Sequence, residues 1–393
     1  MTERDGQRPG VADSGAPQRG VAGEPVPAEA LDVFLSGPIF LDIVLAGLPT
    51  APRPGTEVWA TGMGSLPGGI ANLAVAASRL GLGTGLATGF GGDVYGRWCW
   101  DILADEAIDL SYSTRVPQHT SVTVSMAYGG DRSMVTHGHE LPMGYDELIG
   151  DPPPTRAVII DLDEERAQER WWRRARAAGA RVFADVGWDP SERWSPDRLA
   201  ALDDCYAFLP NAAEAMAYTR THTPTAAARA LAERVPLVVV TMGGEGAIAV
   251  DAERGEERQV PALRVEAIDP TGAGDVFLAA FARGTLADWP LEQRLRFAAL
   301  CSGLAVQEFG GSLAAPGIGD LHDWWQQLET AHRAGNPAAT ALREHYRFLP
   351  EVLPARPGRI TRRAEATFAL DSDLLPPGGT AAHDKERHHE QSP

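Results

Sequence analysis

The sequence contains little of what several large classes of protein require. Only three of its 393 residues are cysteines, and Cys99, Cys205 and Cys301 are far apart and lack metal-ligand spacing. They are expected to be reduced core thiols, which indicates a cytoplasmic protein. No stretch reaches the roughly 18 apolar residues that a membrane helix needs, and the N-terminus lacks the apolar segment of a secretion signal. We therefore expect a soluble chain with no membrane partner.

Blocks of positive charge are also missing. The 35 Lys and Arg residues are outnumbered by 53 Asp and Glu residues, which gives a formal net charge of −18. No run of Lys or Arg is long enough to follow a phosphate backbone, so nucleic acid is not an expected partner. Because 44% of the residues are hydrophobic, the chain can bury a large core. The composition is that of a globular protein.

Both ends of the chain are poor in large apolar residues. Residues 1–30 and 351–393 are predicted to be mostly disordered, because burial could not offset the entropy lost on ordering them. Residues 321–350 are predicted to form a helical extension. The remaining block, 31–320, is predicted to be a single domain.

Within that block, apolar strands alternate with helical segments. Continuous apolar runs, typical of strands covered on both faces of a parallel sheet, occur at 157–162, 181–186, 206–210 and 237–242. Helices are predicted between them at 164–178, 211–219 and 225–234. This alternation predicts an α/β fold with a doubly wound sheet. Two β-rich segments, starting near 32 and 120, break the rhythm and are expected to form a small separate sheet.

A glycine-rich turn in front of an apolar helix is the first functional signal. In D-P-T-G-A-G-D (269–275), Gly272 and Gly274 allow a sharp turn before the helix. The amides of Gly272, Ala273 and Gly274 are then candidates for unpaired first-turn donors, which form a site for an anion such as phosphate. Asp275 has two interpretations at this point: a carboxylate that caps the helix, or a general base that takes a proton from a hydroxyl.

A second glycine cluster, P-G-G-I-A-N-L, lies at 67–73. Gly68 and Gly69 let the backbone approach a ligand closely, and Asn72 offers both a donor and an acceptor that suit polyol hydroxyls. A tight turn followed by an Asn cap would give the same pattern, so both interpretations remain open from these residues alone.

Taken together, four motifs resemble those of the PfkB family, the ribokinase-like sugar and nucleoside kinases, in a match from 31 to about 317. The motifs are G-G-I-A-N-L-A at 68–74, L-P-N-A-A-E-A at 209–215, V-V-V-T-M-G-G-E-G-A at 238–247 and D-P-T-G-A-G-D-V-F at 269–277. The resemblance implies a Rossmann-like, mostly parallel sheet with helices on both faces and a small β-sheet lid, taken from about 32–60 and 115–140.

The resemblance also implies an activity: an ATP- and Mg²⁺-dependent kinase that phosphorylates a hydroxyl, with the primary alcohol of a small sugar as the expected acceptor. A nucleoside kinase of the same fold and a non-catalytic sugar-binding regulator are the alternatives. Retention of a base argues against the regulator. A homodimer is left open.

The same resemblance assigns roles to single residues. Asp275 would be the catalytic base, with Gly272, Ala273 and Gly274 as the anion hole. The acceptor would be held by Asp42, Gly68, Gly69 and Asn72. The nucleotide would be bound by Asn211, Thr241, Gly243, Gly246 and Thr271. Glu214 would bind Mg²⁺ through water, and Asp269, together with Thr271, would lie where some members hold a monovalent cation such as K⁺.

Simpler interpretations accompany several of these residues. Asp42 has the alternative of an edge charge that discourages aggregation. Asn211 and Glu214 have the spacing of a capping box, which does not exclude a magnesium role. His137 and His139, with no third ligand nearby, are predicted to be solvated loop residues.

The chain also departs from the family pattern. Gly187, in D-V-G-W-D-P, stands where many sugar kinases of the family have Asn, and no Lys-Gly follows Gly68 and Gly69. The first difference argues against a simple fructokinase-like or ketodeoxygluconate-kinase-like specificity, and the second argues against ribose as the acceptor. Asp161 and Asp163, just after a predicted strand, lie where α/β folds build sites, and a contact with the substrate is left open for them without being the favoured interpretation.

Overall fold

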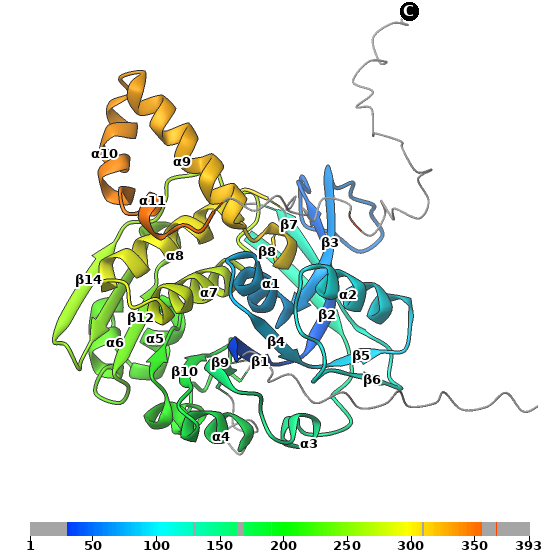
Figure 1. The fold of residues 1–393 in the computed structure, drawn as a ribbon. Helices are drawn as coiled ribbons and strands as arrows, with labels where there is room; N and C mark the ends of the chain where they lie inside the picture. The colour runs from blue at the N-terminus through cyan, green and yellow to red at the C-terminus, as the bar shows by residue number, and fades with distance from the viewer. Residues whose placement is uncertain are drawn as a thin grey trace, which may run out of the picture.

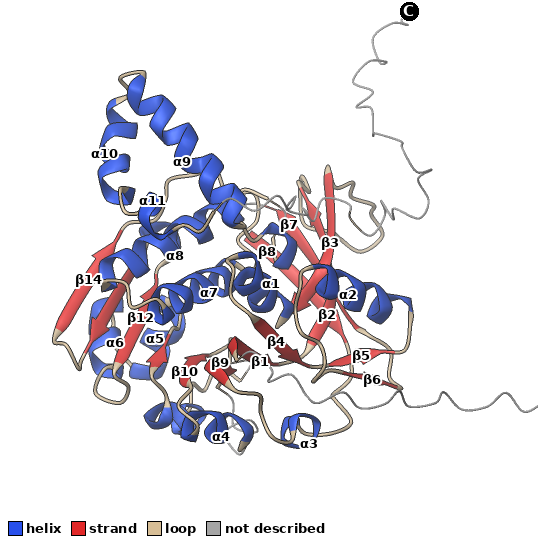
Figure 2. Cartoon of the chain, viewed as in Figure 1, coloured by secondary structure: helices blue, strands red, loops and turns tan. Residues whose placement is uncertain are grey.

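The structure is a computed structural model that describes residues 30–128, 131–162, 169–189, 191–308, 310–355 and 367. The predicted tails lie almost wholly outside these residues, as does Asp163. The described chain forms a large sheet with helices around it and a smaller sheet beside it (Figures 1 and 2). Among the described helices, none has the length and apolar character needed to span a bilayer.

The main sheet contains eight strands: β1 (Leu31–Ser36), β4 (Thr84–Ala87), β9 (Thr155–Asp161), β10 (Arg181–Asp185), β11 (Ala207–Phe208), β12 (Leu237–Thr241), β13 (Ala247–Asp251) and β14 (Glu256–Val260). Their spatial order is β14-β13-β12-β11-β10-β9-β1-β4. The pairs from β4 to β12 are parallel, and the two pairs that include β13 are antiparallel. The four predicted apolar strands are therefore β9 to β12, side by side in the sheet.

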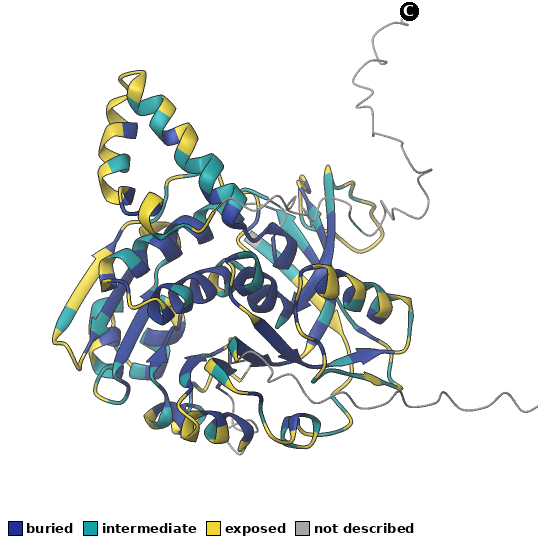
Figure 3. Cartoon of the chain, in the orientation of Figure 1, coloured by how far each residue is buried: buried dark blue, intermediate teal, exposed yellow. Residues whose placement is uncertain are grey.

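Helices cover both faces of this sheet, which confirms the doubly wound arrangement. One face carries α1 (Ala71–Arg79), α7 (Ala273–Leu286) and α8 (Leu291–Ala305), and the other carries α3 (Tyr145–Ile149), α4 (Trp171–Ala177), α5 (Ala212–Thr219) and α6 (Pro224–Leu231). A further helix, α2 (Val94–Asp105), packs mainly against strands outside this sheet. In β1, Val33 and Leu35 belong to the first apolar cluster and Phe34 to the second, because successive side chains of a strand point to opposite faces. The central strands are buried as a result (Figure 3).

A smaller sheet has the order β3-β2-β7-β8. Its strands are β2 (Ile39–Ala46), β3 (Gly62–Gly69), β7 (Ser121–Tyr128) and β8 (Asp131–His137), and β5 (Gly89–Gly91) pairs with β6 (Thr114–Val116) nearby. The small sheet is confirmed, but its strands differ from those predicted. β1 enters the main sheet because Gly37 and Pro38 interrupt the β-rich run, and proline has no amide to continue a ladder. β3 was not predicted, since its P-G-G end has the composition of a turn.

Three helices follow the sheet region: α9 (Ile318–Arg333), α10 (Pro337–Tyr346) and α11 (Leu349–Val352). Short 3₁₀ segments are η2 (Pro196–Asp204), η3 (Gly243–Glu245) and η4 (Ser312–Ala314). In Figure 1, α9 and α10 project from the rest of the chain as a helical hairpin. Leu321, Tyr346 and Leu349 join the main apolar cluster and so attach this hairpin to α8 and its surroundings. That residues 321–350 form a separate extension remains a prediction.

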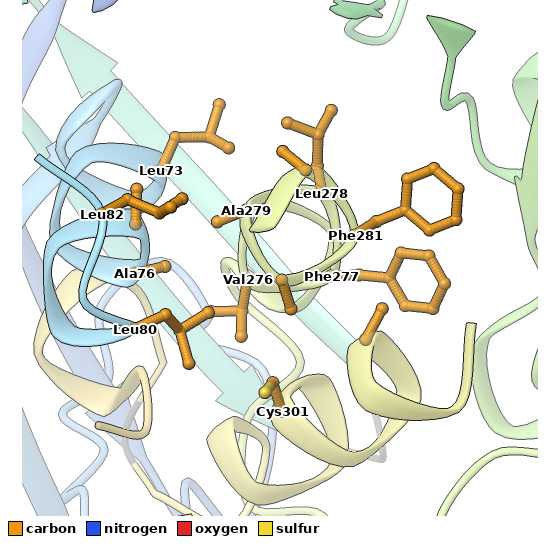
Figure 4. Close-up of a cluster of buried hydrophobic side chains, with 14 of the residues drawn as sticks. Leu73, Ala76, Leu80, Leu82, Val276, Phe277, Leu278, Ala279, Phe281 and Cys301 are labelled. Carbon is orange, nitrogen blue, oxygen red and sulfur yellow. The ribbon is translucent and has the colours of Figure 1, made fainter. Parts of the chain in front are cut away.

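The packing of α1 against α7 determines where the two glycine motifs meet. Leu73 and Ala76 of α1, together with its C-cap Leu80, lie beside Val276 and Ala279 of α7 (Figure 4). Both helices are buried along most of their length, so their N-terminal ends are held in a fixed relationship. The first residues of α1 and α7 therefore lie next to each other, although they are about 200 positions apart in the sequence.

Candidate active site

The turn before α7 is a fixed structure rather than a flexible loop. Gly272 is the N-cap of α7 and has a φ of 74°, which an L side chain rarely adopts. A Cβ at Gly272 would lie 2.9 Å from Gly311 Cα, and the Gly311 amide donates to the Thr271 carbonyl over 2.8 Å. The turn is thus held from both sides and needs glycine on steric as well as conformational grounds.

The amides of this turn form the predicted group of donors only in part. The Ala273 amide donates to the Pro270 carbonyl over 3.2 Å, which closes the turn. In the described part of the chain, no group accepts a hydrogen bond from the amides of Gly272 and Gly274. These two amides, at the positive end of a long buried helix, are the available donors for an anion.

Asp275 and Asn72 are in direct contact. Asn72 Nδ2 donates to Asp275 Oδ2 over 3.1 Å, a bond between the first turns of α1 and α7. The other polar atom of this amide, Oδ1, is buried and has no partner among the described residues. A buried acceptor without a donor is costly, so this oxygen is suited to accept from a ligand hydroxyl.

Asp42 reaches the same place from β2. The residue is 8% exposed, and a Cβ on Gly68 of the neighbouring strand β3 would overlap the Asp42 carboxylate. Gly68 is therefore required to make room for Asp42, whereas Gly69, with a φ of 63°, provides the turn into α1. The glycine pair was predicted to let a ligand approach the backbone closely, whereas the group that approaches Gly68 is a carboxylate of the protein itself. A direct contact of Gly68 and Gly69 with the acceptor stays a prediction.

The two carboxylates are shifted toward neutrality. Burial raises the pKa of Asp275 to about 6, against the lowering effect of the hydrogen bond from Asn72. Burial also raises the pKa of Asp42 to about 7, with the Thr123 hydrogen bond lowering it and the charge of Asp275 adding to the rise. A carboxylate with a pKa near 6 is a competent general base at neutral pH.

Further carboxylates lie at the carboxyl ends of the central strands. Asp161 ends β9, Asp185 ends β10, and Glu214 follows β11 in the first turn of α5. Burial raises the pKa of Asp185 well above its ordinary value, and the charges of Asp275 and Glu214 raise it further. Clustered carboxylates repel one another, so a divalent cation among them would relieve that repulsion. Oxygen donors of this kind match the preference of Mg²⁺.

Asn211 and Glu214 form the predicted capping box. Glu214 N donates to Asn211 Oδ1, and Asn211 N donates to Glu214 Oε2, each over 3.0 Å. Burial raises the pKa of Glu214, while its hydrogen bonds to Asn211 lower it. The box uses only one carboxylate oxygen of Glu214, so capping leaves the second oxygen for another ligand.

A cavity of 270 Å³ lies between the predicted nucleotide loop and the turn before α7. Its lining contains Thr241, Gly243 and Gly246 on one side and Ala273 and Gly274 on the other. Apolar side chains, including Leu263, Val265, Phe277 and Val306, complete the wall. An apolar slot that ends at free amides has the shape and chemistry for a base at one end and phosphates at the other.

Comparison with known proteins agrees with this geometry. The model of the pfkB family carbohydrate kinases matches residues 51–317. The chain belongs to the PfkB family. A nucleoside kinase of Methanothermobacter thermautotrophicus is 28% identical over 300 residues, which cover 75% of this chain and 95% of the relative. A ribokinase of Lactococcus lactis is 26% identical over 304 residues, which cover 76% and 98%.

Solved structures extend the comparison to the fold. A candidate ribokinase II from E. coli in complex with ATP and Mg²⁺ has a TM-score of 0.64 at 21% identity, covering 76% of this chain and 99% of that one. The likeness confirms the ribokinase-like fold predicted from the motifs. The family match identifies this protein as a kinase of the PfkB family.

One residue of this PfkB site was not predicted. Arg132, from β8 in the smaller sheet, donates to Thr271 Oγ1 over 2.5 Å and lies 3.7 Å from Asp269 Oδ1. Asp269 is 1% exposed and also accepts from Thr271 N, Thr271 Oγ1 and Gly310 N. No sequence pattern indicates this contact, because it joins residues 139 positions apart, one in β8 and the other in the turn before α7. Asp269 thus braces the turn and pairs with a guanidinium.

Proposed function

We propose that this PfkB-family protein transfers a phosphoryl group from ATP to a hydroxyl of a small sugar, with Asp275 as the base. The observation that carries the proposal is the position of Asp275, half-buried beside free amides of the α7 turn and bonded to Asn72. A base and an anion hole side by side are what transfer to an alcohol requires.

The acceptor would lie between the two sheets. Asn72 Oδ1 and the Asp42 carboxylate are buried polar groups that can hold its hydroxyls, and Gly68 makes room for that carboxylate. Asp275 would remove the proton from the hydroxyl that attacks. The amides of Gly272 and Gly274 would stabilise the charge that develops on the phosphoryl oxygens.

The residues present also fit the nucleotide and the metal. Thr241, Gly243 and Gly246 border the 270 Å³ cavity that would hold ATP, with Asn211 joined to Thr241 by a β-bridge. Glu214 would bind Mg²⁺, directly or through water. When bound, Mg²⁺ neutralises phosphate charge. The protein's own carboxylates position it, and the smaller sheet would exclude water from the site as a lid.

Four finer points are part of the proposal. A nucleoside is the second acceptor class, favoured by the nucleoside kinase among the relatives. A K⁺ ion near Asp269 and Thr271 would have to displace the Arg132 guanidinium, which argues against K⁺ dependence. A cytoplasmic location agrees with three buried free cysteines, and a homodimer could form through the edge strand β8, where Met134 and Val135 are exposed.

The test is a phosphotransfer assay with ATP and Mg²⁺ over a panel of sugars and nucleosides. Asp275→Asn is expected to lower kcat by about 10²- to 10⁴-fold while ATP still binds, because only the base is lost. Asp101→Asn, at an exposed position of α2, is the matched control. Undiminished turnover in Asp275→Asn would overturn the mechanism. Tight sugar binding without any turnover in the unaltered protein would favour the regulator instead.

A further inference from the structure

Three histidine side chains meet at the base of the β7–β8 hairpin. His119 lies just before β7, His137 ends β8, and His139 follows two residues later. Each offers a ring nitrogen, and these three nitrogens all lie within 4.8 Å of one another. The expectation that His137 and His139 are exposed is met, but the missing third ligand is supplied by His119 from another segment.

The separation of the nitrogens fits a small metal ion. Zinc binds histidine nitrogen at about 2.0–2.1 Å, so two nitrogens on a tetrahedral zinc are about 3.3 Å apart. His119 Nε2 and His139 Nε2 are 2.9 Å apart, close to that value, and this contact requires one of the two to carry a proton. A metal ion would replace the shared proton and need only small ring rotations.

The backbone that carries His119 is anchored independently of any ligand. Asp93, the N-cap of α2, accepts from Thr120 N over 2.7 Å and from Thr120 Oγ1 over 2.8 Å. His119 Nδ1 lies 3.4 Å from the Thr120 carbonyl oxygen, which directs Nε2 toward the other rings. A histidine that binds a metal through one ring nitrogen commonly donates its other ring N–H to a backbone carbonyl, which fixes the orientation of the ring. On the other strand, the pairing of Val122 with His137 fixes the end of β8.

We propose that His119, His137 and His139 bind one Zn²⁺ ion, with the fourth position open to water. Imidazole donors select zinc and its neighbours in the first transition row, whereas Mg²⁺ and Ca²⁺ require oxygen donors. The site is therefore distinct from the carboxylate cluster at the ends of β9 and β10.

The position of the site links it to the acceptor region. His119 and His139 line a cavity of 820 Å³ that is also bordered by Phe40 and Thr136. Thr136 Oγ1 is 3.0 Å from Thr123 Oγ1, and Thr123 hydrogen-bonds to Asp42. An ion on the three histidines would tie the start of β7 to the end of β8. It would stiffen the hairpin whose other end carries Arg132.

The direct test is isothermal titration of the full chain with ZnCl₂, with MgCl₂ as the negative control. One Zn²⁺ per chain is expected. The affinity for Zn²⁺ should fall at least about 100-fold in each of His119→Ala, His137→Ala and His139→Ala. Loss of a residue that only hydrogen-bonds to a metal ligand typically costs about 10- to 100-fold. His222→Ala, at an exposed histidine of the loop after α5, is the matched control and should leave binding unchanged. Because all three ligands are exposed, these variants should fold normally.

The sequence contains other histidines that a titration must separate from this site. A variant with His383, His388 and His389 replaced by alanine should keep the full affinity for Zn²⁺. Loss of binding in that variant, or unchanged binding when His119, His137 and His139 are all replaced, would overturn the proposal, as would no Zn²⁺ binding by the unaltered chain. A zinc-dependent rise in melting temperature that disappears in His119→Ala would support it.

Discussion

Asn72 Nδ2 lies 3.1 Å from Asp275 Oδ2, and this hydrogen bond joins the two glycine motifs into one site. The bond has an electrostatic role as well as a positional one. Burial raises the pKa of Asp275 to about 6, and Asn72 opposes that rise. Asn72 therefore keeps the carboxylate ionised at neutral pH, the form in which it can accept a proton.

The pH dependence of turnover should report this coupling. In the unaltered protein kcat should rise as pH increases through about 6, because Asp275 acts as a base only when deprotonated. Asn72→Ala removes the bond that lowers the pKa, so the midpoint of the kcat profile should move up by roughly one pH unit. The measurement is kcat at saturating substrates between pH 5 and 9, a range set by the expected midpoints of about 6 and 7.

The control for this experiment is an Asn→Ala variant that lowers stability at a position far from Asp275 in the sequence. Asn336→Ala removes the N-cap of α10, where Asn336 Oδ1 accepts from Ala338 N over 3.0 Å. Its kcat profile should keep the original midpoint. If Asn72→Ala also kept it, Asn72 would not set the protonation of Asp275.

The buried Asp42 carboxylate should help to bind the acceptor but lower the stability of the folded chain when it is ionised. Its pKa is raised from 3.8 to about 7, so the folded chain binds a proton more tightly than the unfolded chain does. The stabilisation is complete below pH 4 and is lost as pH rises from about 4 to about 7. Asparagine cannot ionise, so Asp42→Asn removes this pH-dependent loss of stability. At pH 8 the free energy of unfolding of the variant should exceed that of the unaltered protein by an amount on the order of a few kcal/mol.

Two comparisons decide that prediction. The free energies of unfolding of Asp42→Asn and the unaltered protein should converge toward pH 4 and diverge toward pH 8. The same variant should have a raised KM for the acceptor, since the carboxylate is lost from the pocket. Equal pH dependence in both proteins would show that Asp42 is not the group whose ionisation opposes folding.

Glu214 has two roles that one substitution can separate. Glutamine at this position can still complete a capping box with Asn211, but it removes the negative charge. Glu214→Gln should therefore leave the melting temperature nearly unchanged and raise the Mg²⁺ concentration for half-maximal rate about tenfold or more. Glu233→Gln, at an exposed position after α6, is the matched control. An unchanged Mg²⁺ dependence in Glu214→Gln would show that Glu214 caps α5 but does not bind Mg²⁺.

The parts of this structure that were predictable from sequence are those with a local signal. β9 to β12 are continuous apolar runs, and the Asn211–Glu214 box depends on a spacing of three residues. The turn at Gly272 was also predictable, because a positive φ there requires glycine.

Other features depend on residues that meet only in the folded chain. The assignment of β1 to the smaller sheet was wrong, because one proline separates strands that enter different sheets. His119 lies 18 positions before His137, and its spacing carries no metal signal until β7 and β8 pair. Gly68 was interpreted as a turn or a ligand contact, since the carboxylate that requires its missing side chain comes from another strand.

Arg132 leads to the last prediction. Its guanidinium is held by Thr271 and Asp269, next to the free amides of Gly272 and Gly274. A positive charge at that position would stabilise charge on a transferring phosphoryl group. Arg132→Gln should therefore lower kcat by about 10²-fold or more with a smaller effect on KM. The kcat of Arg132→Lys should fall between those of Arg132→Gln and the unaltered protein, because lysine keeps the charge but not the planar guanidinium.

The alternative is that Arg132 only braces the loop that contains Asp269. In that case Arg132→Gln would lower the melting temperature while kcat at a permissive temperature stayed near its original value. Arg97→Gln, at an exposed arginine of α2, controls for the loss of one positive charge. Because β8 carries Arg132 at one end and His137 at the other, a rate defect in Arg132→Gln would identify the smaller sheet as part of the catalytic machinery rather than a passive cover.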